Sequence, residues 1–143
     1  MIVLDTTVLV YAVGAEHPLR EPCRQIVTAV RNQHMDGTTT AEVVQEFAHV
    51  RARRRGRDDA ADLAMEFVDL LSPLLIIEEE HLRAGLGLFR RSSHLGAFDA
   101  VLAAAAVGAG AAALVSADVG FAEVRDLRHV IPRAGVVDAL VGL

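Results

Sequence analysis

Residues 92–117 read SSHLGAFDAVLAAAAVGAGAAALVSA, an apolar stretch in which Asp99 is the only acidic residue. Its composition predicts a buried helix over 98–107, then a glycine-rich turn, then a strand over 113–116. The residues on the same helix face as Asp99 are all apolar: Leu102, Ala103 and Ala106. Burying an unpaired carboxylate is costly, so such a group shifts its pKa, pairs with a cation or binds a metal. We therefore expect the functional site among the residues that share the surroundings of Asp99.

The composition predicts one compact soluble domain over residues 1–143. The chain is 52% hydrophobic, with a formal net charge of −5, and is long enough for one well-buried core. All 14 basic residues are arginines, which excludes P-loop NTPases because their phosphate-binding residue is lysine. The single Cys23 supports neither a disulfide framework nor a cysteine-rich metal site, and it favours the reducing cytoplasm. We expect no secretory signal, because residues 1–7, MIVLDTT, have no basic region before an apolar stretch. We expect no membrane span, because Asp99 and several glycines interrupt the apolar stretch.

Short strands alternate with helices along the chain. Strands are predicted at 2–4, 113–116 and 129–131, with 38–40 as a short strand or loop after a turn at Asp36-Gly37 and 74–77 as an extended segment. Helices are predicted at 22–32, 41–55, 58–71, 78–91 and 98–107. This alternation is typical of an α/β sandwich with a mostly parallel sheet.

Three acidic residues from distant parts of the chain are expected at one edge of this sheet. Asp5 follows the first strand and Asp118 comes just after 113–116, and ligands of parallel sheets bind outside the carboxyl ends of the strands. Asp99 lies at the start of its helix, where the helix dipole favours the charged carboxylate. Singly, each acid has an ordinary interpretation as a turn residue or a helix cap. Their joint placement is what indicates a site.

The segment TTAEVVQEF, residues 39–47, offers a fourth acid, and its two glutamates differ in position. Thr39 and Glu42 have the spacing of a capping box, which gives Glu42 a local role at the helix start and leaves it as a neighbour of the site. Glu46 lies one turn further along, at the margin of an apolar stripe. We prefer Glu46 as the acid of the pocket.

Four carboxylates in one pocket require either protons or a cation. Two of them roughly 5 Å apart repel by about 3 kcal/mol at an effective dielectric near 20. An all-oxygen set of Asp and Glu favours Mg²⁺ or Mn²⁺ over zinc. Such ions generate a hydroxide nucleophile and neutralise charge on a phosphoryl group, so the inferred chemistry is phosphodiester hydrolysis.

Four segments, taken in order, resemble the PIN domain and specifically the VapC-type toxins of bacterial toxin-antitoxin pairs. They are MIVLDTTVLVYA (1–12), TTAEVVQEF (39–47), GAFDAVLAAAA (96–106) and LVSADVGF (114–121). The resemblance implies a three-layer α/β/α sandwich and a Mg²⁺- or Mn²⁺-dependent endoribonuclease. The acids that bind the metal and carry catalysis would correspond to Asp5, Glu46, Asp99 and Asp118.

The same resemblance implies supporting residues, products and partners. Thr6 or Thr7 looks like the hydroxyl that supports the first acid, and Ser116 resembles a similar polar neighbour of the last acid. The products would carry a 5′-phosphate and a 3′-hydroxyl. The implied partners are an RNA substrate, a cognate VapB-type antitoxin and a second copy of the chain in a homodimer.

A cluster of arginines ends the predicted helix 41–55, and it has two interpretations of equal weight. Its members are Arg51, Arg53, Arg54 and Arg55, with Arg57 just beyond. The first interpretation is a solvated helix end that complements the helix dipole. The second is a patch that contacts RNA phosphates or the antitoxin, because an acidic protein that cuts RNA needs local positive charge to attract it.

Two other functions stay open at this level. One is a catalytically silent PIN-like module that binds RNA or a protein partner without cleaving. The other keeps the nuclease chemistry but serves RNA processing or DNA cleavage instead of toxicity. The presence of all four acids favours an enzyme over a silent module.

Overall fold

Four short parallel strands form the sheet of the computed structural model, which describes all residues, 1–143. The strands are β1 (Ile2–Leu4), β2 (Gly37–Thr38), β3 (Ala113–Val115) and β4 (His129–Val130). Their order across the sheet is β2-β1-β3-β4, and every neighbouring pair is parallel. Leu4 in β1 is opposite Val115 in β3. The residues that follow these two strands therefore leave the sheet side by side at its carboxyl edge.

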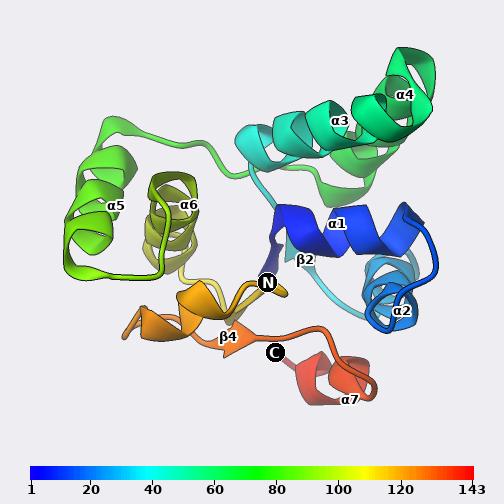
Figure 1. Cartoon of the computed structure of the whole chain (residues 1–143). Helices are drawn as coiled ribbons and strands as arrows, with labels where there is room; N and C mark the ends of the chain where they lie inside the picture. Colours follow the sequence, from blue (N-terminus) through cyan, green and yellow to red (C-terminus); the bar gives the residue numbers. More distant parts are fainter.

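Helices cover both faces of this sheet. They are α1 (Thr6–Val13), α2 (Arg20–Arg31), α3 (Ala41–Arg55), α4 (Arg57–Leu71), α5 (Glu79–Arg91), α6 (Ala97–Gly108) and α7 (Val136–Leu140), with a 3₁₀ turn η1 (Val119–Glu123) after β3. In Figure 1, α5 and α6 lie on one side of the sheet, and α1, α2 and α7 lie on the other. This arrangement confirms the predicted α/β sandwich, with a sheet that is entirely parallel.

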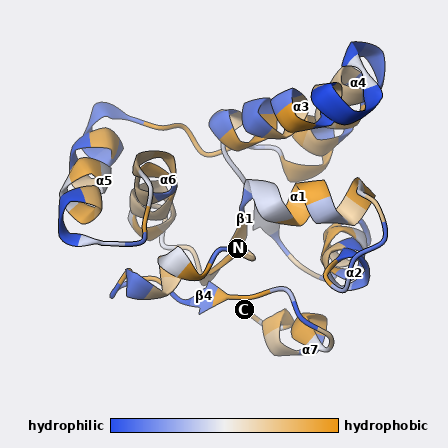
Figure 2. Cartoon of the chain, viewed as in Figure 1, coloured by the Kyte–Doolittle hydropathy of each residue, from blue (hydrophilic) through white to orange (hydrophobic).

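The core lies between the sheet and its helices. Every residue of β1 and β3 is fully buried, as expected for strands covered on both faces. Phe47 of α3 and Phe67 of α4 meet edge to face inside this core, with ring centroids 5.0 Å apart. Figure 2 shows the hydrophilic residues gathered on the outer parts of α3 and α4, away from the sheet. No helix combines the length and the apolar composition that crossing a bilayer requires.

Most predicted elements agree with the structure, and α1 is the main omission. The apolar stretch forms α6, a turn and β3 as predicted, with α6 one residue longer at each end. Residues 6–13 read TTVLVYAV, and such β-branched sequence resembles a strand more than a helix. The short elements η1 and α7 were also not predicted. The turn predicted at Asp36-Gly37 is wrong for Gly37, which belongs to β2 and pairs with Ile2.

Helices α5 and α6 approach each other closely at Gly85. A Cβ atom at this position would lie 2.6 Å from the Cα atom of Val101 and 2.8 Å from its backbone nitrogen. Contacts this short with backbone require the two helices to move apart. Gly87, two residues further along α5, faces only the flexible end of Arg91 at 3.4 Å.

This difference predicts opposite effects of the same substitution on stability. Gly85→Ala is expected to lower the free energy of unfolding by about 1 to 3 kcal/mol, because overpacking forces backbone shifts. Gly87→Ala is expected to raise it by about 0.5 to 1 kcal/mol, because alanine favours helix. Urea denaturation of both variants measures the effect. Equal stability of the two variants would contradict this close approach of α5 to α6.

Candidate active site

Asp5 ends β1 and is held by two hydroxyl groups. Its Oδ2 atom accepts a hydrogen bond of 2.6 Å from the Oγ of Ser116 and one of 3.1 Å from the Oγ1 of Thr7. The residue is only 4% exposed. Burial raises the pKa of Asp5 above its usual value, although the hydrogen bonds from Ser116 and Thr7 act in the opposite sense. The chain thus buries an acid at the sheet edge and stabilises its charged form with hydroxyls.

The two hydroxyls around Asp5 also hold the loop that follows β3. The Oγ of Ser116 accepts a hydrogen bond from the backbone N–H of Asp118 at 2.9 Å, and the Oγ1 of Thr7 accepts one from the N–H of Ala117 at 3.0 Å. Ser116 is fully buried at the end of β3, beside β1. The first acid and the last acid are therefore positioned by the same small network.

Thr6 supports a different acid. Its Oγ1 donates a hydrogen bond of 2.9 Å to the Oε2 of Glu46 on α3. The sequence left open whether Thr6 or Thr7 supports the site, and the structure gives each threonine its own carboxylate, with Thr7 on Asp5. Both hydroxyls lie in the first turn of α1, directly after β1.

The start of α3 differs from the prediction. The capping box between Thr39 and Glu42 is wrong, because Thr39 is fully buried and its Oγ1 donates to the carbonyl oxygen of Leu4 at 2.6 Å. Thr40 is the N-cap instead, and its hydroxyl accepts from the N–H of Val43 at 3.2 Å. A long-range hydrogen bond to β1 takes precedence over the local motif. Glu42 is exposed and lines the same cavity as Glu46.

Asp99 lies in the first turn of α6, close to the other acids. Burial and the negative charges of its neighbours raise the pKa of Asp99 to about 7. These neighbours, in order of effect, are Asp5, Asp118 and Glu46. Asp118 caps η1, where its Oδ1 accepts a hydrogen bond of 2.8 Å from the N–H of Gly120. The structure thus brings together all four acids from which the sequence predicted the site.

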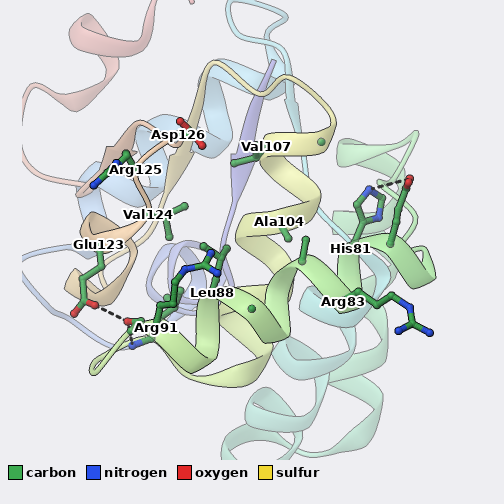
Figure 3. Close-up of a pocket in the computed structure, with 16 residues that line it drawn as sticks. His81, Arg83, Leu88, Arg91, Ala104, Val107, Glu123, Val124, Arg125 and Asp126 are labelled. Atoms are coloured by element: carbon green, nitrogen blue, oxygen red, sulfur yellow. Dashed lines mark hydrogen bonds and ion pairs between the residues drawn. The ribbon is translucent and has the colours of Figure 1, made fainter.

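A cavity of about 750 Å³ contains three of these acids. Asp5, Glu46 and Asp99 line one part of it, and the side chains elsewhere around it are mostly apolar, including Phe98, Ile77, Leu82, Leu86, Val101 and Leu102. A larger cavity of about 1120 Å³ lies between α5, α6 and η1 (Figure 3). That larger cavity holds charges of both signs, such as Arg91 and Glu123, and none of the four acids. The smaller cavity is therefore the candidate active site.

The donor set at this cavity fits a hard divalent cation. The neighbouring charges that raise the pKa of Asp99 are all carboxylates, and their mutual repulsion is what a cation relieves. No three His, Cys, Asp or Glu side chains converge as a ready-made metal-binding group. Mg²⁺ does not require such a cage, because it retains several waters and binds through one or two carboxylates. Asp5 and Asp99 satisfy that requirement, with Glu46 and Asp118 nearby.

The arginine cluster divides into one structural residue and an exposed remainder. The Nε of Arg51 donates to the Oδ1 of Asp59 on α4, and its Nη1 donates to the carbonyl oxygen of Val13 at 2.9 Å. Hydrogen bonding to Arg51 lowers the pKa of Asp59. Arg51 thus joins three helices and is not available to RNA. The exposed members Arg53, Arg54 and Arg55 lie in the last turn of α3 and do not line the acidic cavity.

Phe98 is the residue of this cavity that sequence reasoning missed. The sequence places it at the start of an apolar helix, where a phenylalanine is expected to belong to the core. In the structure it is 86% exposed and lines the cavity that holds the acids. The sequence does contain one indication of this position, because Phe98 directly precedes Asp99. A residue next to an acid in the first turn of a helix lies at the end of the helix that faces the site.

Comparison with known proteins gives matches over nearly the whole chain. The PIN domain family matches residues 2–127. Ribonuclease VapC7 of Mycobacterium tuberculosis (strain ATCC 25618 / H37Rv) is 55% identical over 146 residues, covering 99% of each protein. The structure of FitAB bound to an IR36 DNA fragment has a TM-score of 0.73 at 17% identity, over 92% of this chain and 95% of that one. VapBC2 from Rickettsia felis, bound to a DNA fragment from their promoter, has a TM-score of 0.69 at 16% identity, over 92% and 98%. The two structural likenesses concern the α/β fold.

Proposed function

Because the chain belongs to the PIN-domain family, among its VapC ribonucleases, we propose that it is a Mg²⁺- or Mn²⁺-dependent endoribonuclease and the toxin of a VapBC-type pair. The observation that carries the proposal is the convergence of three further acids on the half-buried carboxylate of Asp99, where burial and their negative charges raise its pKa to about 7. Such a cluster is costly in a protein that binds no cation and useful in one that does. The 55% identity with a ribonuclease over the full chain supports the same chemistry.

The residues of this chain have distinct roles in the proposed reaction. Asp5 and Asp99 would hold the ion, and Ser116 and Thr7 keep Asp5 oriented through its Oδ2. When bound, the ion supplies a hydroxide nucleophile and neutralises charge on the phosphoryl group. Glu46 has its Oε2 fixed by Thr6, so its other oxygen remains to accept a hydrogen bond from water. In-line attack of water at phosphorus would break the bond from phosphorus to the 3′ oxygen, which would take up a proton, so the products would carry a 5′-phosphate and a 3′-hydroxyl.

The proposal includes partners and a setting. We propose that the chain, as a single PIN domain, acts in the cytoplasm as a homodimer and that a VapB-type antitoxin controls it. The exposed arginines Arg53, Arg54 and Arg55 supply positive charge for RNA or for the antitoxin on a protein of net charge −5. Titration of purified chain with the small protein encoded beside it tests this partnership.

Purified protein is expected to cleave cellular RNA in the presence of Mn²⁺, with loss of cleavage on addition of EDTA. Asp5→Asn is expected to be inactive, because it removes the buried charge at the end of β1. Asp62→Asn, which alters an exposed acid on α4 outside the cavity, serves as the matched control and should cleave normally. Sequencing of the 5′ ends of the products gives the cleavage sites.

The outcomes of this experiment separate the candidate functions. Intact RNA with a folded, Mn²⁺-loaded chain would favour the silent binding module. Cleavage in vitro without growth arrest on expression would favour an RNA-processing role. Growth arrest that the neighbouring small protein relieves, and that Asp5→Asn does not cause, is the result expected of a toxin.

A further inference from the structure

Phe98 presents an exposed aromatic ring that lines the acidic cavity. It is 86% exposed, the highest exposure among the large hydrophobic residues of the chain. Single exposed hydrophobic residues are ordinary on protein surfaces. Phe98 differs because it lines the cavity of Asp5, Glu46 and Asp99 and directly precedes Asp99 in the first turn of α6. The ring is therefore a neighbour of the place where a phosphodiester would react.

Other apolar residues extend this aromatic surface. Leu82 and Leu86 lie one turn apart on α5, and each is 46% exposed. Val101 lies one turn after Phe98 on α6, and all four residues line the cavity. The cavity therefore offers carboxylates and, beside them, an apolar surface. A nucleotide has the matching parts, since its phosphate binds near a metal while its base offers a flat apolar face.

The charges around the cavity disfavour further phosphates, which leaves the base as the part of an RNA that this apolar surface can contact. No arginine lines the cavity and the chain has no lysine, so neighbouring phosphates have no basic partner there apart from the imidazole of His49. The carboxylates repel those phosphates. A base is neutral and stacks on an aromatic ring, so contact with a base is the favourable interaction left at this position.

We propose that Phe98 stacks on an unpaired base next to the cleaved phosphodiester. This inference rests on the proposed ribonuclease function. A base inside a duplex already stacks on its neighbours and is not available to the ring, whereas bases in loops and single strands can turn outward. Phe98 acts here as a binding and specificity residue, and the carboxylates remain the residues that carry the reaction.

Steady-state cleavage of a single-stranded RNA oligomer tests the role of the ring. Phe98→Ala is expected to raise KM roughly 5- to 150-fold, the range of base–aromatic stacking, with little change in kcat. Phe98→Trp should retain a KM near that of the wild type, and Phe98→Leu, which keeps apolar area without a ring, should resemble alanine. Phe89→Ala on α5 is the matched control, because Phe89 is half-exposed and does not line the cavity. An unchanged KM in Phe98→Ala would overturn the proposal.

A second substrate identifies the contact as a base. An oligomer that lacks the base beside the mapped cleavage site should raise the KM of the wild type, and Phe98→Ala should add little to that increase, because both changes remove the same contact. Additive effects would overturn the proposal. So would an unchanged KM together with an altered oligomeric state, which would assign Phe98 to a protein interface.

An experiment on binding alone distinguishes failure of the stacking proposal from failure of the proposed ribonuclease function. If the wild type cleaves no RNA, binding of a labelled single-stranded oligomer, followed by fluorescence anisotropy, replaces the kinetic measurement. Phe98→Ala is then expected to bind at least about fivefold more weakly than the wild type, and Phe89→Ala to bind equally well. Equal affinity of Phe98→Ala and the wild type would overturn the stacking proposal independently of catalysis.

Discussion

Asp99→Asn is expected to abolish RNA cleavage while making the metal-free protein more stable above pH 7. The loss of activity should exceed about 100-fold, because metal-assisted stabilisation of a phosphoryl group is worth several kcal/mol and each 1.36 kcal/mol is a factor of ten in rate. The gain in stability follows from removing a carboxylate whose charged form is disfavoured by burial and by the negative charges of three neighbouring acids. A residue with a purely structural role would change stability in the opposite direction.

The pH dependence of stability gives this prediction its sign. The pKa of Asp99 is raised from an ordinary 3.8 to about 7 in the folded chain. Between these two values the folded chain holds a proton that the unfolded chain has lost, so the contribution of Asp99 to the free energy of unfolding falls as pH rises from about 4 to about 7. Asparagine does not titrate. The stability advantage of Asp99→Asn should therefore be small near pH 4 and reach on the order of 1 to 2 kcal/mol above pH 7, after allowance for solvent screening of a half-buried group.

Thermal unfolding in EDTA at pH 5 and pH 8 measures this effect, with Asp62→Asn as the control acid. The difference in midpoint between Asp99→Asn and the wild type should be larger at pH 8. Added Mn²⁺ should raise the midpoint of the wild type and have much less effect on the variant, because a ligand that binds only the folded state stabilises it. A sharp fall in the metal-free stability of Asp99→Asn would show that the carboxylate chiefly caps α6.

Phe47→Ala is expected to have the largest effect on stability. Phe47 is fully buried in α3 and packs edge to face against Phe67 of α4 at 5.0 Å. Removing a buried phenylalanine ring costs about 3 to 5 kcal/mol, which is a large part of the 5 to 15 kcal/mol typical of a domain. Urea denaturation should show this loss, and Phe47→Leu should lose less because it leaves a smaller cavity. A loss below about 1 kcal/mol in Phe47→Ala would contradict the tight packing of α3 on α4.

The substitution Phe47→Ala is expected to lower stability without removing cleavage activity. Phe47 is the neighbour of Glu46, whose orientation depends on the hydroxyl of Thr6 rather than on the Phe47 ring. In the cold and without urea, the folded fraction of Phe47→Ala should therefore keep most of its cleavage activity. This result would distinguish a residue that maintains the fold from one that maintains the site.

The acids were predictable from the sequence because their placement depends on local and topological rules. Asp5 follows a buried strand and Asp118 lies just beyond another, so parallel pairing brings these two acids to one edge of the sheet. Asp99 starts an apolar helix, and the packing of that helix on the sheet brings its N-terminal end to the same edge. The sequence did not predict that Thr6 bonds to Glu46 while Thr7 bonds to Asp5. This arrangement depends on how the first turn of α1 faces α3 and β3, and α1 itself was missed because its sequence is rich in β-branched residues.

Two other features depend on long-range contacts that no local pattern contains. Thr39 has the spacing of a capping box, yet its hydroxyl bonds to Leu4 in β1 because the chain passes beside that strand. Phe98 belongs to an apolar helix, yet its side chain is exposed because the first turn of α6 lines the cavity instead of the core. Local propensity describes the helix in both cases, and the tertiary packing decides what each side chain contacts.

The hydrogen bond between Asp5 and Ser116 also determines when the site can first exist. Its two residues are separated by 111 positions, and β1 obtains its neighbour β3 only from residues 113–115. During synthesis, the amino-terminal four-fifths of the chain, which includes Asp5, is made before Ser116, Asp118 and the end of strand β3. A ribosome translating this message therefore holds an incomplete nuclease until the last part of the protein emerges.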